Sequence, residues 1–195
     1  MGFTYDHYTA AAAASANRFV VSQNMLNGAY TLTGTLTMPT AGARKVTVTH
    51  TLVSTVDTLG VITVTGTNLA GQTQTDVITP LSGTIATGVK LFSTITSIVG
   101  SGWTAVAGAD TVVIGCDATQ AVLDGGGVLR SVVVNTTAAG TVTLADAKGT
   151  IAVLKASIAE GTYYFDIDVV GVLTVTQTAA SDITVVHSPP WTSFG

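Results

Sequence analysis

The sequence has very little charge for its length. Only 9% of its 195 residues are charged, seven basic against eleven acidic, for a formal net charge of −4. An ordinary soluble domain carries roughly 25% charged residues. One Glu and four Lys cannot cover the exposed faces of several amphipathic helices, which excludes a large helical domain. A nucleic-acid partner is excluded as well, because phosphate binding needs clustered Lys and Arg, and Arg44-Lys45 is the only adjacent pair.

Cysteine and membrane-spanning runs are also missing. Cys116 is the single cysteine, so the chain can form no internal disulfide and Cys116 alone cannot build a zinc site. We interpret it as a small core residue at the end of a strand. The stretch Leu91–Ala109 is uncharged, but Gly100-Ser101-Gly102 interrupts it, which indicates two strands and a turn and no membrane contact. The segment Ala10–Ala16 lacks the flanking regions of a signal peptide.

β-branched residues are abundant where charged residues are few. The chain has 36 Thr, 27 Val and 10 Ile. Such side chains are stiff at χ1 and fit a pleated surface better than a helix. With 47% apolar residues and a low net charge, the chain is also unlike a disordered one. We therefore predict an all-β fold of two β-sandwich domains, immunoglobulin-like and then small and jelly-roll-like, with an N-terminal arm.

The first domain is predicted over residues 29–120, after an arm over residues 1–28 that has no alternating pattern and becomes ordered against a neighbour. Alternating apolar and Thr residues predict strands, which we list as Tyr30–Thr37, Lys45–Val53, Val61–Gly66, Gln72–Thr79, Val89–Val99, Trp103–Ala107 and Thr111–Gly115. The loop Thr67–Gly71 contains Asn and Gly, which favours a hairpin. About seven short strands are typical of a sandwich.

The second domain is predicted over residues 121–187, with Gly125–Gly127 as the linker before it. We expect strands at Leu129–Asn135, Thr141–Ala145, Thr150–Lys155, Thr162–Val169, Val172–Thr176 and Ile183–His187, with a turn at Asp146–Gly149. On Thr162–Val169 the pattern places Tyr163, Phe165, Ile167 and Val169 on one face. The tail over residues 188–195 contains Pro189-Pro190 and cannot be a central strand.

No catalytic motif appears. The chain lacks a G-x-S-x-G elbow, H-E-x-x-H, a P-loop and G-x-G-x-x-G, and its three histidines have no ligand spacing. Asp166 and Asp168 lie on one face of a strand about 6.5–7 Å apart, a separation found in inverting glycosidases. The alternatives are a calcium site or a pair that keeps an aromatic strand wet and blocks edge pairing. We expect the last, and hence no enzyme, no cofactor and no metal.

Neutral threonine faces predict burial between copies of the chain. Strand edges without Lys, Glu or Pro are open to pairing, and low charge removes long-range repulsion between packed copies. We therefore predict that the chain is a building block of a symmetric homo-oligomer or a larger assembly. The candidate interface residues are Phe3, Tyr5, Tyr8, Thr47, Thr49, Trp191 and Phe194.

The run Val61–Ile98 resembles an element of structural proteins from tailed-bacteriophage virions. The matching positions are Gly66, Thr67, Asn68, Gly71, Asp76, Gly88, Phe92, Ser97 and Ile98. The second domain, with LRSVVVNTTAAGTVTLADAKGTIAVL and YYFDIDVVGVLTVTQT, is similar to phage head or tail accessory β-domains.

This resemblance implies a virion protein, made in the host bacterial cytoplasm, without catalytic residues. Within that class the expected role is a capsid decoration (cement) protein on the head surface, with a homotrimer favoured and the major capsid protein or other virion proteins as partners. The alternatives are a phage neck, tail-tube or tail-accessory protein, and a carbohydrate-binding or adhesin module in which Trp103 or Trp191 stacks on a sugar.

Overall fold

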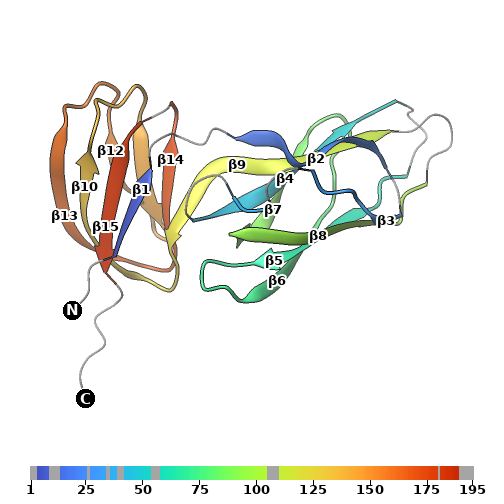
Figure 1. The fold of residues 1–195 in the computed structure, drawn as a ribbon, viewed down its shortest axis with the longest axis horizontal. Helices are drawn as coiled ribbons and strands as arrows, with labels where there is room; N and C mark the ends of the chain where they lie inside the picture. Colours follow the sequence, from blue (N-terminus) through green and yellow to red (C-terminus); the bar gives the residue numbers. More distant parts are fainter. Residues whose placement is uncertain are drawn as a thin grey trace, which may run out of the picture. The chain divides into compact units, whose positions relative to one another are not determined.

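The computed structural model describes residues 4–8, 14–25, 27–33, 36–38, 42–53, 58–104, 110–179 and 181–188. Within these ranges the regular secondary structure consists of β-strands alone, which confirms the all-β class (Figure 1). The strands are β1 (Thr4–Tyr8), β2 (Ser15–Asn24), β3 (Gly28–Ala29), β4 (Ala43–Thr51), β5 (Val61–Thr67), β6 (Thr73–Ile78), β7 (Ile85–Phe92), β8 (Thr94–Ser101), β9 (Thr111–Leu123), β10 (Gly127–Val134), β11 (Val142–Asp146), β12 (Gly149–Leu154), β13 (Gly161–Val169), β14 (Leu173–Gln177) and β15 (Ile183–Ser188). Among the described residues no helix could cross a membrane.

The chain divides into two compact units, each with its own hydrophobic core. The central unit comprises residues 14–38 and 43–117, and the terminal unit comprises residues 1–13, 39–42 and 118–195. The division falls within β9, between Asp117 and Ala118, so that one strand contributes to both units.

The central unit has two layers of strands around an apolar core. One layer has the order β2-β9-β4-β7 and the other β3-β8-β5-β6. Alternation explains the core, because Ile62 and Val64 on β5 and Val46 and Val48 on β4 are fully buried while the residues between them are more exposed or polar. Phe19, Phe92 and Ile98 complete the interior from β2, β7 and β8.

The terminal unit also has two layers, with the orders β1-β15-β10-β13 and β12-β11-β14-β9. Figure 1 shows β15, β10 and β13 beside one another. Leu129 and Ile183 from one layer share a core with Leu144 and Leu173 from the other. A β-bulge interrupts the pairing of β10 with β13 between Leu129 and Ser131.

The two units have the same strand order. When the eight strands of each unit are numbered along the chain, one layer reads 1-8-3-6 and the other 2-7-4-5 in both cases. Strands 4 and 5 form the hairpins β5–β6 and β11–β12. An immunoglobulin-like sheet places its first two strands side by side. In the central unit β2 and β3 lie in different layers, and the described strand order does not confirm the immunoglobulin-like detail expected for residues 29–120.

Two expectations about domain organisation differ from the observed chain path. Residues 1–28 were expected to form an arm, but β1 pairs with β15 and β2 pairs with β9, so both strands complete layers of this chain. The glycines Gly125–Gly127 do not separate the units. They form the corner between β9 and β10, where Gly125 and Gly126 have φ of 88° and 83° and the Gly126 N–H donates to the Gly171 carbonyl (2.6 Å).

Candidate interaction surface

The central unit buries a histidine–aspartate pair. His50 Nε2 lies 2.8 Å from Asp110 Oδ2, and both side chains are completely buried. Asp110 Oδ1 accepts the Val53 N–H at 2.6 Å, and His50 Nδ1 accepts the Gly83 N–H at 3.4 Å. Because Nδ1 accepts, Nε2 carries the proton and donates it to the carboxylate. The pair joins the end of β4 to the start of β9, and both of its side chains are shielded from solvent.

The two acidic residues of β13, Asp166 and Asp168, lie at and beside a β-bulge. Asp166 has φ of 49° at the bulge and forms an ion pair with Arg130 (Nη1–Oδ1 2.9 Å). The bulge breaks the regular alternation from which the carboxylate spacing was derived, and Ile167, expected to point inward, is 40% exposed. In the described part of the chain no three His, Cys, Asp or Glu side chains are grouped as metal ligands.

Asp146 fixes the turn between β11 and β12. Its Oδ2 accepts the Val170 N–H at 2.9 Å and its Oδ1 accepts the Lys148 N–H at 2.8 Å. These backbone donors, Val170 first, lower the pKa of the Asp146 carboxyl. The carboxylate therefore holds two turns together.

Trp103 and Cys116 lie in the central core. Trp103 is only 6% exposed, and Asn27 holds its backbone through bonds to both N–H and carbonyl (3.0 and 3.1 Å). It is therefore not available to stack on a sugar, while Trp191 lies outside the described residues. Cys116 is fully buried, and burial raises the pKa of its thiol. Burial likewise lowers the pKa of Arg44, whose Nη1 donates to the Asp117 carbonyl at 2.9 Å.

The outward face of sheet β3-β8-β5-β6 is a neutral grid, which we call the threonine face. Cross-strand neighbours place hydroxyl residues in rows: Thr75, Thr65 and Ser97 form one, and Thr73, Thr67 and Thr94 form the next. The residues of this face are Val61, Thr63, Thr65, Thr67, Thr73, Thr75, Val77, Thr94, Thr96, Ser97, Val99 and Ser101, and none of them is charged. Rows lie about 6.6–6.8 Å apart along a strand and neighbours about 4.7–4.9 Å apart across strands.

Hydroxyl groups on the threonine face bond to one another. Thr67 Oγ1 lies 2.6 Å from Thr94 Oγ1, and Thr65 Oγ1 lies 3.4 Å from Thr75 Oγ1. The Thr96 hydroxyl donates to the Thr65 carbonyl at 3.1 Å. A surface that already satisfies part of its hydrogen bonding and carries no charge loses less hydration energy on burial than a charged one. Its chemistry suits a broad protein contact.

The predicted interface residues of the two ends of the chain fall partly inside and partly outside the described residues. Phe3, Trp191 and Phe194 lie outside the described residues. The backbones of Tyr5 and Tyr8 lie in β1, in register with Val186 and Ile183.

The two threonines of β4 differ from the outward position expected for them. Thr47 is 8% exposed, and Thr49 is half-buried. β4 lies between β9 and β7, and an internal strand has neighbours on both sides that shield its outward side chains. Thr47 is therefore covered and not exposed to solvent, as an interface residue of the free chain would have to be. The threonine face lies on β5, β6 and β8 instead, and the alternating Thr of Val61–Thr67 was the signal for it.

Comparisons of the chain with protein-family models, with curated proteins and with solved structures found no match. The strands and their order define an all-β protein of two units with a repeated strand order, and the neutral threonine face is its candidate site.

Proposed function

We propose that the protein is a structural component of a bacteriophage virion, and that it binds and stabilises the head shell as a decoration (cement) protein. The threonine face carries this proposal. It extends over three strands without a charged residue, which suits a surface that is permanently covered in an assembly. The resemblance of Val61–Ile98 to virion proteins supports the same class.

The strand order gives independent support. Both units have the layer order 1-8-3-6 against 2-7-4-5 with a hairpin between strands 4 and 5, and this order supports an eight-stranded jelly roll in each. Jelly rolls are a frequent architecture of viral capsid domains and lectins. We infer two jelly rolls in one chain, the central one inserted after the first strand of the other.

The proposal is tested by sedimenting the purified full chain with heads and, separately, with tails of tailed phages. Thr65→Lys and Thr75→Lys place a charge in the middle of the threonine face. They should weaken binding to heads at least tenfold, because burying an unpaired lysine is costly. Thr136→Lys, at an exposed position of the terminal unit, is the matched control and should bind like the wild type.

Circular dichroism must show that the variants stay folded. Wild-type binding to tails but not heads would replace the decoration role with the neck or tail alternative. Failure to bind either, or full binding by both lysine variants, would overturn the proposal.

A further inference from the structure

The terminal unit has an open seam between two edge strands. Among the described residues, β12 pairs only with β11 and β13 pairs only with β10. β13 is a nine-residue strand with a bulge at Asp166, and no other strand of the described residues covers its free side. Residues 155–160 join the end of β12 to the start of β13, so the two edges run in opposite directions.

The equivalent seam of the central unit is closed. There the fifth and sixth strands are β6 and β7, and side chains of β6 satisfy the backbone of β7. Asp76 Oδ2 accepts the N–H groups of Val89 and Lys90 at 2.8 and 3.0 Å, and Gln74 Nε2 donates to the Leu91 carbonyl. No such bonds join β12 to β13 in the described residues. Side-chain hydrogen bonds therefore join the fifth and sixth strands in the central unit, and no such bonds join them in the described part of the terminal unit.

Apolar side chains line the open seam. Ile151, Ile158, Tyr163 and Phe165 pack on the terminal core but stay half-exposed, and Ile167 is exposed. A hollow of about 300 Å³ lies at one end, with Ile151 and Ile167 among its lining residues. Burial of such a strip against another protein is favourable.

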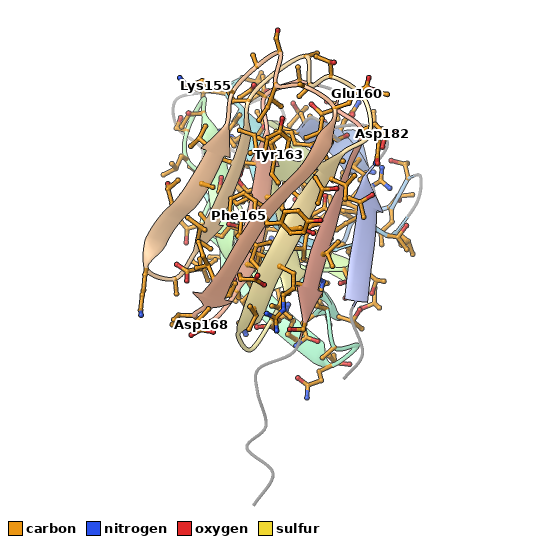
Figure 2. The ribbon with its side chains drawn as sticks, turned by 90° about the vertical axis from the view of Figure 1, so that its left-hand side faces the viewer. Lys155, Glu160, Tyr163, Phe165, Asp168 and Asp182 are labelled. Carbon is orange, nitrogen blue, oxygen red and sulfur yellow. The ribbon has the colours of Figure 1, made fainter. Side chains whose placement is uncertain are left out.

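Charges of opposite sign flank the two edges. Lys148 and Lys155 stand directly before and after β12, whereas Glu160 precedes β13 and Asp168 lies near its end. Lys148 and Asp168 line the same hollow, and Figure 2 shows Glu160 and Asp168 toward opposite ends, with Tyr163 and Phe165 between them. All four charged side chains are exposed, and within the described chain none of them forms an ion pair.

We propose that a second copy of this chain covers the seam, with β12 of each copy beside β13 of the other. A twofold axis along the seam creates both pairs at once and keeps the paired strands antiparallel, as an isologous interface requires. Lys148 then faces Asp168 of the second copy, and Lys155 faces Glu160 of the second copy. The apolar strips of the two copies cover each other.

Charge complementarity selects this arrangement over the other twofold one. If β13 met β13 and β12 met β12, acidic ends would face acidic ends and lysines would face lysines. Like charges directly opposite across strands are destabilising. The inference concerns the chain itself and does not depend on the proposed virion function.

Analytical ultracentrifugation of the purified full chain tests the dimer without any particle. Wild type should form dimers, and the double variants Lys148→Glu/Lys155→Glu and Glu160→Lys/Asp168→Lys should each raise the dissociation constant at least 100-fold. An equimolar mixture of the two variants should associate again, because each edge of one then meets an opposite charge on the other. Lys90→Glu is the matched control, because Lys90 is an exposed residue of β7 at the closed seam; this variant should dimerise like the wild type.

Three results would overturn the proposal. A wild type that stays monomeric at millimolar concentration has no such interface. If the charge variants associate as tightly as the wild type, the interface does not lie at this seam. If the two variants fail to associate when mixed, β12 does not pair with β13 of the second copy. Circular dichroism of each variant distinguishes loss of the interface from loss of the fold.

Discussion

The buried His50–Asp110 pair shows how a single polar contact connects distant parts of the central unit. The two residues are 60 positions apart in the chain, and each also accepts a hydrogen bond from a backbone N–H. A buried carboxylate is tolerated only when its oxygens are satisfied, and here Val53 and His50 supply one bond to each. The pair therefore stabilises the fold mainly because loss of either residue would leave the other buried without this hydrogen bond.

Replacing His50→Ala should lower the free energy of unfolding by about 3–5 kcal/mol, because Asp110 would keep a buried charge without its partner. Urea denaturation followed by circular dichroism measures the change. Thr51→Ala, at an exposed neighbouring position, should change it by at most about 0.5 kcal/mol. A loss for His50→Ala no larger than that of Thr51→Ala would show that the pair is energetically neutral.

The residue types alone indicated some of these sites and not others. Cys116 was interpreted as a core residue at the end of a strand; it is fully buried as expected, but it lies inside β9 and not at its end. His50 could only be recognised as unsuited to a metal site, because its partner Asp110 is remote in sequence and no local pattern pairs them. The prediction that Thr47 is exposed was wrong for a similar reason, because its burial depends on which strands flank β4, and local sequence does not show that.

At the level of elements, the docking of β2 depends on a residue without a side chain. A Cβ at Gly115 on β9 would lie 1.7 Å from the Ser15 carbonyl oxygen and 2.5 Å from the Ala16 carbonyl carbon. Backbone atoms cannot move aside as the end of a flexible side chain can. Glycine at this position therefore allows β2 to approach β9 closely.

Gly115→Ala should detach the first part of β2, with a loss of about 1–3 kcal/mol or more. Hydrogen exchange should show lost amide protection over Ser15–Val20, while β12 and β13 keep theirs. Val113→Ala, two residues away on the same strand, should leave β2 protected. Unchanged protection in Gly115→Ala would mean that the two strands adjust their spacing at little cost.

Local patterns predicted most strands but not the strand order. Alternation located β5, β6, and β10 to β15, and the Asn68–Gly71 turn forms as expected, with Gly71 at φ 75°. The expected strand Tyr30–Thr37 is absent over its described residues, where Thr37 forms only an isolated bridge to Thr94. The expected strand Val89–Val99 is two strands separated at Ser93. In both places long-range pairing overrides local propensity.

For the whole molecule, the repeated strand order means two separate cores in one chain. Ile98 belongs to the central core and Leu129 to the terminal core, and both are almost completely buried. Nothing in the sequence pattern marked the repeat, because strands that are equivalent in the two units have different residues and different loop lengths. It became visible only from the pairing of strands.

Ile98→Ala and Leu129→Ala should each cost about 2–5 kcal/mol, each in its own unit. Differential scanning calorimetry should resolve two transitions, one lowered by Ile98→Ala and the other by Leu129→Ala. A single transition that both variants lower equally would show that the two cores unfold as one cooperative system.

The pairing of Thr4 with His187 has a consequence for synthesis of the chain. β1 leaves the ribosome well before its partner β15 is made, so the terminal unit cannot close until β15 has emerged. The central unit has all its strands much earlier and can fold in the meantime. Newly made chains thus pass through a stage with one finished unit and an unpaired first strand, when capture by chaperones or exchange of β1 between neighbouring chains competes with completion.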